Sequence, residues 1–552
     1  MTPLPEAPVS IESPATPHPD SAPARLNGEP AVLLTDVVPA PTRVRPDPAA
    51  TFTLRPDTTI RCGRQPGAVA VAEHLAELLR PATGYPLPVG PLDGEPPGDL
   101  RLLLTNLPAV GTDGYRLTVT PTRVTLAAPT PTGLFHGVQT LRQLLPWQIE
   151  SRTPVARAWT VPGGEITDTP RFAYRGAMLD VARHFFDVPD VLRFIDHLAR
   201  YKLNHLHLHL TDDQGWRIAI DRRPALTRAG AATQVGGGEG GYYSKSDYRR
   251  IVRYAAAHHI TVVPEVDMPG HTHAALTAYR ELAPDDTVPA PYTGTEVGFS
   301  SLALDRETTY EFLADVLGEL AELTPGPYLH IGGDEAFHVP GPEFAAFVTR
   351  AQSLVAATGK IPIGWHQLAA AEHRPGRILQ YWGTSGEDPL LAAAVRRGDR
   401  VILSPADRCY LDMKYDPQTP IGHDWAGTID VQRAYDWDPE SHLDGVPAGA
   451  VLGLEMPLWT ESVTTMEEIE FMLFPRLPAL AELAWSPRSA RDWPALSRRL
   501  TAQAWRWTEA GITFHRAPEL PWPVPAQRRP DSDSSANSGS ATEAGPAADP
   551  GH

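Results

Sequence analysis

The stretch YRGAMLDVARHFFDVPDVLRFIDHLARYKLNHLHLHLTDD, residues 174–213, places a helical pattern between two short apolar runs. The runs YRGAMLDV and HLHLHLTDD have the length and composition of buried strands. Between them, DVLRFIDHLARYKLN carries apolar residues at helical spacing. A strand, a helix and a second strand in this order are typical of an α/β architecture.

The same alternation continues toward residue 510. Six further strands are expected within residues 260–271, 328–335, 361–367, 377–383, 400–405 and 449–461. Helices are expected over 244–259, 309–323 and 343–358, with shorter helices later and long helices at the end. Eight apolar strands in βα alternation over roughly 350 residues predict a (β/α)8 TIM barrel, which we assign to residues 169–517.

Residues 31–168 show a different pattern, which predicts a small α+β domain. Strands are expected over 51–62 and 99–107 and twice within 114–129, and helices over 68–80 and 132–145. The Pro and Gly residues of TVPGGEITDTP, residues 160–170, predict a linker to the barrel. The flanking segments 1–30, rich in Pro and Ala, and 518–552, of low complexity, are expected to be disordered.

Composition limits the possible partners. The formal net charge is −18 and no Lys/Arg cluster stands out, so neither a nucleic acid nor an anionic membrane is expected as a partner. No window of 18 apolar residues predicts a transmembrane span. The first residues lack a basic and an apolar signal-peptide region, which favours a cytoplasmic over a secreted protein. Cys62 and Cys409 are expected to be free thiols, and no oligomeric state is predicted.

Polar and aromatic side chains collect where the expected barrel strands end. They are Asp180, Asp212, Glu265, Asp267, Asp334, Glu335, Trp365, Trp382, Trp459 and Glu461. Barrel enzymes place their active sites at the carboxyl ends of the strands. Polar strand ends meeting solvent would explain one or two carboxylates but not the repeated Trp. The pattern therefore predicts an active site.

The adjacent carboxylates of Asp334 and Glu335 end the run YLHIGGDE. If the strand continued through them, the two side chains would point to opposite sides and act on different objects. Each carboxylate also favours a proton on its neighbour, which suits a general acid near neutral pH. The alternative is an acidic cap of the following helix. The two preceding glycines permit close backbone approach and favour a site.

The run HLHLHL sets His205, His207 and His209 on one face of one strand. An H-x-H pair on a barrel strand can bind a metal, but the further compact ligand group of a catalytic zinc centre is missing. Packed, hydrogen-bonded histidines lining the barrel are the favoured interpretation. His271 follows the third strand, and Asp212 or Asp213 is a natural partner for it.

Tryptophans form another group of candidates, at positions 365, 382, 425 and 459. Most Trp residues belong to protein cores, but three at strand ends beside acids favour a binding role. Aromatic faces pack against the apolar faces of sugar rings and against methyl groups. Trp, carboxylate and Arg side chains around one cleft are therefore typical of a sugar site.

Several motifs occur in the order and spacing found in family 20 glycoside hydrolases, the β-N-acetylhexosaminidases. They are DVARHFF, HLHLTDDQGWR, DMPGHT, HIGGDEA, GWH, QYWG, YLDMKY and LWTE. The chain resembles this family across residues 170–510, and the preceding segment is similar to the small domain that commonly precedes its barrel. The resemblance implies a retaining mechanism in which the 2-acetamido oxygen of the substrate is the nucleophile and an oxazolinium ion forms.

The resemblance also implies residue roles, a substrate with a terminal β-linked N-acetylhexosamine, and no cofactor or metal. Glu335 would be the general acid and then the base, Asp334 would orient the acetamido N–H, and Tyr410 would bind its oxygen. Other positions match substrate contacts: Trp365, Trp382 and Trp459 around the acetamido methyl and ring, Arg183 and Glu461 at the 3- and 4-hydroxyls, and Asp412 and Trp425 near the 6-hydroxyl. Asp212 and His271 match a supporting pair beside the acid.

Other functions remain open at this point. Spacing alone leaves Glu461 or Asp212 as an alternative nucleophile. A metal-dependent hydrolase could use the histidine strand, and a non-catalytic glycan-binding protein could keep the same scaffold. Within the enzyme interpretation, release of disaccharides instead of single sugars is an alternative.

Overall fold

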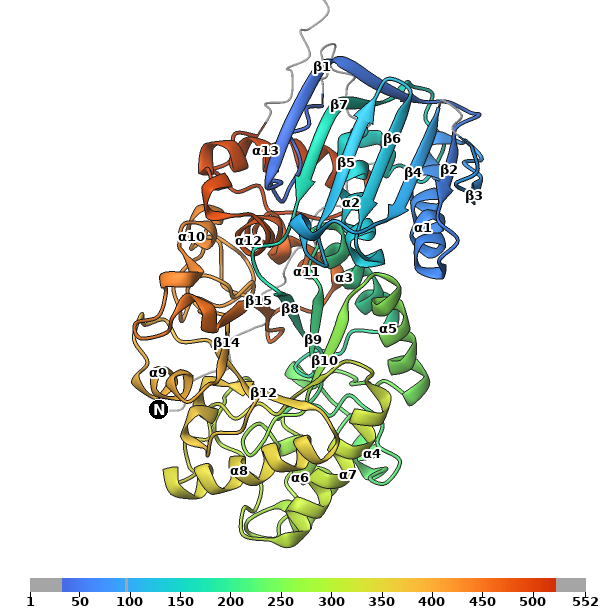
Figure 1. Ribbon diagram of the computed structural model, residues 1–552. Coiled ribbons are helices and arrows are strands. Elements are labelled where there is room, and N and C mark those ends of the chain that lie inside the picture. Colours follow the sequence, from blue (N-terminus) through green and yellow to red (C-terminus); the bar gives the residue numbers. More distant parts are fainter. Residues whose placement is uncertain (1–31, 95–97, 523–552) are drawn as a thin grey trace, which may run out of the picture. The chain divides into compact units, whose positions relative to one another are not determined.

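The computed structural model describes residues 32–94 and 98–522 (Figure 1). The first sheet has the strand order β1-β7-β5-β6-β4-β2-β3. Its strands are β1 (Arg43–Leu54), β2 (Thr59–Cys62), β3 (Val89–Pro91), β4 (Asp99–Leu104), β5 (Tyr115–Thr120), β6 (Arg123–Ala128) and β7 (Trp159–Asp168). Helices α1 (Pro66–Thr83) and α2 (Pro131–Leu144) pack on it, so this part of the chain is α+β as expected.

Two expectations for this region are wrong. The segment 160–170 is not a linker, because β7 runs through it and pairs with both β1 and β5. Residues 159, 161, 163, 166 and 168 of β7 are buried, so the strand is held by packing in spite of its Pro and Gly residues. The segment 51–62 holds two strands, since the chain turns between Leu54 and Thr59.

Eight parallel strands form a closed barrel in the order β10-β11-β12-β13-β14-β15-β8-β9, which confirms the predicted architecture. They are β8 (Tyr174–Asp180), β9 (His205–His209), β10 (Thr261–Glu265), β11 (Tyr328–His330), β12 (Ile361–Trp365), β13 (Ile378–Tyr381), β14 (Arg400–Leu403) and β15 (Val451–Leu458). Strands β8 and β9 are buried along their whole length, as expected for strands covered on both faces. Tyr174, Val263, Ile363, Ile378 and Ile402 form a hydrophobic cluster contributed by five strands.

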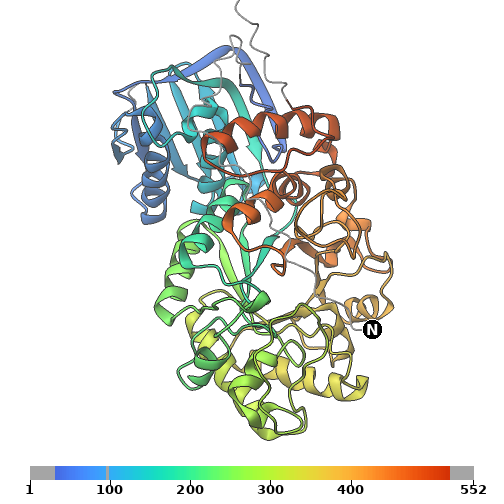
Figure 2. The same ribbon diagram turned by 180° about the vertical axis from the view of Figure 1, so that it is seen from behind.

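Helices follow most of the barrel strands (Figure 2). They are α3 (Val188–Arg200), α4 (Ala225–Ala229), α5 (Lys245–Ala257), α6 (His273–Ala278), α7 (Glu307–Leu323), α8 (Gly341–Ala357), α9 (Pro389–Arg396), α10 (Val431–Tyr435), α11 (Met466–Leu473), α12 (Arg476–Trp485) and α13 (Trp493–Glu509). After β12 the chain forms only a short 3-10 helix, His366–Ala370.

The barrel and the first sheet are joined by buried polar contacts. The ammonium group of Lys202 lies 3.1 Å from Asp168 Oδ2 and also donates to the hydroxyl of Tyr115 at 3.0 Å. Arg499 of α13 donates to the carbonyl of Val37 at 3.0 Å, and α13 lies beside β1 in both ribbon views (Figures 1 and 2). These contacts hold residues far apart in sequence in one compact unit.

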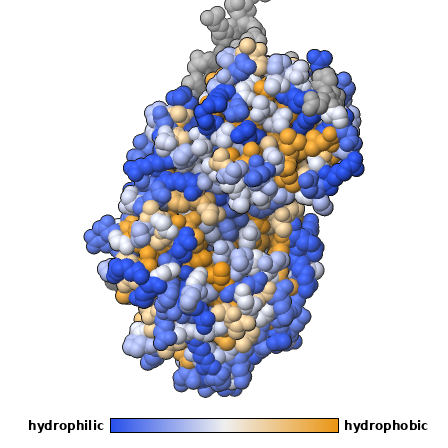
Figure 3. Space-filling view, in the orientation of Figure 1, coloured by the Kyte–Doolittle hydropathy of each residue, from blue (hydrophilic) through white to orange (hydrophobic). Residues whose placement is uncertain are grey.

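The ends of the chain and its surface give three further results. Segment 1–30 lies outside the described residues, and so do 523–552 of the segment 518–552. Within 518–522 the expectation of disorder is wrong, because Leu520 is buried and Glu519 accepts a bond from the Val431 N–H. Cys62 and Cys409 are free thiols, as predicted, and the structure shows that both are buried. Among the described helices, none has the length and apolarity to cross a bilayer, and the face drawn in Figure 3 mixes hydrophilic and hydrophobic residues.

Candidate active site

Every site residue predicted from the sequence lies at the last position of a barrel strand or in the segment after it. Arg183 follows β8, Asp212 follows β9 and His271 follows β10. The remaining positions follow the other strands: Asp334 and Glu335 after β11, Trp365 at the end of β12, Trp382 after β13, Tyr410, Asp412 and Trp425 after β14, and Trp459 and Glu461 after β15. The parallel barrel thus brings residues from all of its strands to one end.

The two glycines of HIGGDE create space for a buried carboxylate. A Cβ atom on Gly332 would lie 1.5 Å from Asp267 Oδ1, and the backbone N–H of Gly333 donates to that same oxygen at 3.0 Å. Both glycines have positive φ, 59° and 101°. The glycine pair therefore lets the chain turn sharply around Asp267 and places the next two residues at the barrel mouth.

The strand argument for Asp334 and Glu335 is wrong, because β11 already ends at His330. Glu335 has a φ of 47°, which few residues other than glycine adopt. Both carboxylates face one imidazole: His271 Nε2 lies 3.9 Å from Asp334 Oδ2 and 3.4 Å from Glu335 Oε2. The two differ instead in exposure, since the Asp334 side chain is 10% exposed and that of Glu335 is 22% exposed.

Asp334 has a raised pKa and one oxygen without a hydrogen-bond partner among the described residues. Burial raises its pKa, His271 lowers it and Glu335 raises it again, and the result is a pKa of about 6. Its Oδ1 atom is buried and has no hydrogen-bond partner among the residues that the structure describes. Buried oxygens normally have a partner, so this atom is free to accept a bond from a ligand.

A row of ion pairs connects the acids. The Arg183 guanidinium lies 2.8 Å from Asp212 Oδ2, 3.3 Å from Asp180 Oδ2 and 3.9 Å from Glu461 Oε1. Burial raises the pKa of Asp212, but the charges of Arg183 and His271 outweigh it and hold the pKa well below its usual range. Asp212 Oδ1 lies 3.2 Å from His271 Nδ1, so Asp212 is the partner of His271 and Asp213 is not.

The pKa values of Glu461 and Asp412 are shifted in opposite directions, although burial raises both. Burial raises the pKa of Glu461, but Arg183 and a bond from His423 at 3.2 Å bring it down to about 2. Burial raises the pKa of Asp412 to about 7, with His423 opposing and Glu461 reinforcing the rise. Asp412 Oδ1 accepts a bond from the backbone N–H of Trp459 at 3.3 Å, and its Oδ2 has no partner among the described residues.

Aromatic rings form a second group of side chains at the same end of the barrel. Trp459 lies 5.9 Å from Trp365 and 6.3 Å from Tyr410 between ring centroids, and the Arg183 guanidinium lies 4.8 Å above its ring. Trp425 lies 5.9 Å from Tyr410 and 6.1 Å from Trp382. Trp365 is fully buried, whereas Trp425 is 56% exposed. Burial raises the pKa of Tyr410, helped by Asp412 and Asp334, so its phenol keeps its proton.

The histidine strand is hydrogen-bonded, as the favoured interpretation predicted. His207 Nδ1 lies 2.7 Å from Glu455 Oε1, and His209 Nε2 lies 2.8 Å from Asp212 Oδ2. Four sets of His and carboxylate atoms nevertheless come within 4.8 Å of one another and could hold a metal ion: His207, Glu265 and His330; His209, Glu265 and Asp267; Asp212, Asp267 and His271; His271, Asp334 and Glu335. In each set the histidines already make ion pairs with Glu265, Asp212, Asp334 or Glu335, whereas no ion pair of Asp267 is among these contacts.

Two family models match the chain. Residues 172–340 and 341–488 match the catalytic domain of glycosyl hydrolase family 20, and residues 34–169 match domain 2 of the same family. The chain belongs to glycosyl hydrolase family 20. This family 20 chain is therefore a glycoside hydrolase, and the resemblance of its motifs to that family is confirmed.

Known relatives of this family 20 chain cover nearly its whole described length. The β-N-acetylhexosaminidase of Cellulomonas fimi is 43% identical over 490 residues, 89% of this chain and 97% of that protein. The solved β-N-acetylhexosaminidase of Streptomyces coelicolor A3(2) is 53% identical with a TM-score of 0.87, over 89% of this chain and 99% of that one. A mutant Streptomyces plicatus β-hexosaminidase in complex with its product GlcNAc is 54% identical with a TM-score of 0.87, over 89% and 98%.

Sequence reasoning left some neighbours out of the site. His423 pairs with Glu461, but nothing in its sequence surroundings IGHDWAG marks it as a partner. Asp267 was noted only as a polar strand end, although it holds the Gly333 backbone. The period-two spacing of the histidine strand predicted that His209 faces the barrel interior, but not that it contacts Asp212.

Proposed function

We propose that this chain is an exo-acting, retaining β-N-acetylhexosaminidase that removes terminal non-reducing GlcNAc or GalNAc from glycans. The single observation that carries the proposal is the pair of adjacent carboxylates that share His271 but differ in burial. Family membership and the names of the relatives support the same activity. The formal charge of −18 favours a neutral carbohydrate over nucleic acid or an anionic membrane as the partner.

Glu335 is the general acid and base in this proposal. Its more exposed side chain protonates the glycosidic oxygen as the leaving group departs. In the second step the same carboxylate takes a proton from a water molecule, which attacks the anomeric carbon. Microscopic reversibility requires that one group serve both steps, and the anomeric configuration is retained.

Asp334 and Tyr410 act on the acetamido group. The carbonyl oxygen of this group attacks the anomeric carbon and forms the oxazolinium ion. The free Oδ1 of Asp334 accepts the acetamido N–H and stabilises the positive charge that develops there. The protonated phenol of Tyr410 donates to the acetamido oxygen and orients it for attack.

The remaining predicted residues hold the sugar. Trp365, Trp382 and Trp459 surround the acetamido methyl and the ring face. Arg183 and Glu461 bind the 3- and 4-hydroxyls by charge-assisted bonds. Asp412, with its unpartnered Oδ2, and Trp425 lie near the 6-hydroxyl in this proposal.

The carboxylates left open as enzyme nucleophiles are poor candidates on this geometry. Asp212 is engaged by Arg183, His209 and His271, and Glu461 by Arg183 and His423. A carboxylate that is already bonded by cations is a weak nucleophile, because attack would break those bonds. The substrate's own acetamido oxygen is therefore the nucleophile that fits this site.

The test compares hydrolysis of an aryl β-N-acetylglucosaminide with that of the matching β-glucoside. The proposal predicts fast release from the first substrate only, because the glucoside has no acetamido group. Comparable rates on both would overturn it. Activity that is lost in Glu335→Gln but survives a chelator would reject a metal-dependent hydrolase, and any turnover that depends on Glu335 would reject a purely glycan-binding role.

A further inference from the structure

Carboxylates and imidazoles alternate in a buried row that runs from the barrel interior to the general acid. The row starts at Glu455 of β15 and ends at Glu335, with every neighbouring pair in contact. Its members, in order, are Glu455, His207, Glu265, His209, Asp212, His271 and Glu335. All of them up to His271 are at most 3% exposed.

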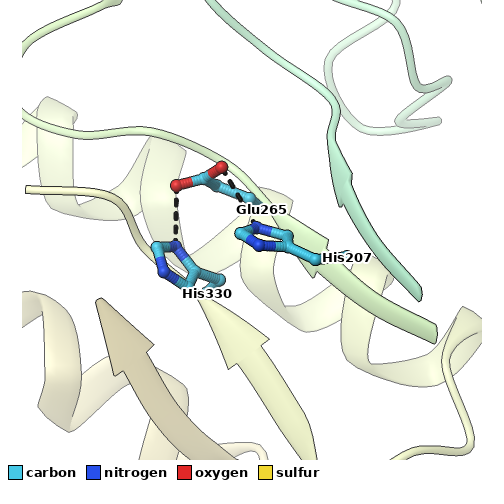
Figure 4. A group of neighbouring side chains, drawn as sticks. All are labelled: His207, Glu265 and His330. Atoms are coloured by element: carbon cyan, nitrogen blue, oxygen red, sulfur yellow. Dashed lines mark ion pairs between the residues drawn. The ribbon is translucent and has the colours of Figure 1, made fainter. Parts of the chain in front are cut away.

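Glu265 is the branching point of this row (Figure 4). One of its oxygens, Oε1, lies 2.7 Å from His330 Nδ1, and the other, Oε2, lies 3.1 Å from His207 Nε2. Oε2 also contacts His209 Nδ1. A single buried carboxylate therefore holds imidazoles from β9 and from β11.

His209 is the middle link of the row, and its geometry defines its protonation. Nδ1 faces Glu265, and Nε2 faces Asp212 Oδ2 at 2.8 Å. A neutral imidazole has only one N–H, so a ring with a carboxylate at each nitrogen is an imidazolium. Burial lowers the pKa of His209, but Glu265 and Asp212 outweigh it and hold the pKa well above its usual value.

Further groups lie near His209 or near its partner Asp212. The Trp459 ring lies 4.9 Å away edge-on, and the Asp267 carboxylate lies within 4.8 Å of the cluster of His209 and Glu265. Burial raises the pKa of Asp267, with Asp334 adding to the rise and His271 opposing it. Besides His209, Asp212 is contacted by the Arg183 guanidinium at 2.8 Å and by His271 at 3.2 Å.

Asp212 connects His209 to His271, which in turn contacts the proposed general acid Glu335. Its Oδ2 is held by His209 and Arg183, so its Oδ1 is directed at His271 Nδ1, 3.2 Å away. Burial lowers the pKa of His271, but Asp212 and Asp334 outweigh it and hold the pKa well above its usual value, so both ring nitrogens carry a proton. Nδ1–H then faces Asp212, and Nε2–H faces Glu335 Oε2, 3.4 Å away. The position of Asp212 therefore determines which way the His271 ring presents its N–H to Glu335.

We infer that His209 is a positioning residue. Its contact with Oδ2 fixes the orientation of the Asp212 carboxylate, and its positive charge helps to set the pH range in which Glu335 delivers its proton. This inference rests on the proposed role of Glu335 as general acid. His209 itself does not touch the sugar; it acts through Asp212 and His271. The same logic makes Glu265 a positioning residue of opposite charge.

The test uses His209→Gln, Glu265→Gln and, as a matched control, His205→Gln. His205 lies on the same strand and face, but its Nδ1 bonds the side chain of Asn204, outside the row. The readout is kcat/KM on an aryl β-N-acetylglucosaminide from pH 4 to 9. Loss of a cation strengthens proton binding by Glu335 and loss of an anion weakens it. The alkaline limb of the kcat/KM profile should therefore move to higher pH in His209→Gln and to lower pH in Glu265→Gln. Each shift should be about one pH unit at an effective dielectric constant of about 20.

The control variant should keep the wild-type alkaline limb. KM for the aryl substrate should change by less than about threefold in His209→Gln, because that side chain makes no contact with the sugar. Equal profiles in His209→Gln and wild type, or shifts of the same sign in His209→Gln and Glu265→Gln, would overturn the inference. Failure of the proposed function is a different result: the wild type itself would hydrolyse the glucoside as well as the acetamido sugar.

A measurement on the unaltered protein covers the case in which a variant does not fold. Neutron diffraction from crystals grown in D2O at neutral pH locates deuterium on the ring nitrogens. The inference predicts deuterium on both Nδ1 and Nε2 of His209. Deuterium on only one of them would overturn it.

Discussion

Replacement of Asp334 by Asn should make the protein more stable at neutral pH while it removes most of its activity. The pKa of Asp334 is about 6 in the folded protein and 3.8 in the unfolded chain. The unfolded chain therefore binds fewer protons between these values, and stability falls as the pH rises through this window. Above pH 6 the cost of ionising Asp334 is about 3 kcal/mol, at 1.36 kcal/mol per pKa unit.

Asn imitates the protonated carboxyl group and does not titrate. The advantage of Asp334→Asn in free energy of unfolding should therefore widen by about 1.4 kcal/mol between pH 5 and pH 8, from the same linkage relation. Urea unfolding followed by tryptophan fluorescence, with identical conditions for both proteins, measures this difference. A smaller advantage at pH 8 than at pH 5 would refute the reasoning about Asp334.

The activity of the same variant tests the role of Asp334 in catalysis. Loss of the carboxylate should lower kcat on an aryl β-N-acetylglucosaminide by about 10²- to 10³-fold, as for removal of one preorganised electrostatic partner. The wild type should show an acidic limb near pH 6 in kcat/KM, because the protonated form cannot stabilise the acetamido charge. An unchanged kcat in Asp334→Asn would contradict the role.

Three further changes follow from the structure. Glu335→Gln should lose about 10²- to 10⁴-fold in kcat on sugar leaving groups but much less on a dinitrophenyl leaving group, which departs without protonation; an equal loss on both would exclude its role as acid. Tyr410→Phe should lower kcat about a hundredfold with little change in KM, because the lost phenol donates mainly in the transition state; a raised KM at constant kcat would indicate simple sugar binding. Lys202→Met should lower the free energy of unfolding, measured by urea, by about 3–5 kcal/mol, because it leaves the buried Asp168 charge unpaired. The double variant Lys202→Met with Asp168→Asn should recover much of this loss. No recovery in the double variant would show that the unpaired charge is not the cause.

The barrel was predictable because its strands carry their signal locally. The segments around β8 and β9 are buried on both faces and therefore read as continuous apolar runs. The strand ends were predictable for the same reason, since Asp180 and Trp365 interrupt or end such runs. The β7 segment was misread because its Pro and Gly suggest a linker, whereas its pairing with β1 depends on residues more than a hundred positions away.

The arrangement of the acids was less predictable than their identity. β11 ends at His330, and the next residues turn at Gly332 because Asp267, in the segment after β10, occupies the space that a side chain at position 332 would need. No local rule gives that contact. The pairing of His423 with Glu461 also joins two different loops, so a single sequence could name one partner and not the other.

The central claim is that the nucleophile belongs to the substrate. A series of aryl β-glucosaminides that carry N-acetyl, N-fluoroacetyl, N-difluoroacetyl and N-trifluoroacetyl groups tests it most directly. Each fluorine withdraws electrons from the amide oxygen and weakens it as a nucleophile while the leaving group stays the same. The account predicts that kcat/KM falls steeply at each step of the series. A rate that does not depend on fluorination would contradict it and would return the nucleophile to a carboxylate of the enzyme.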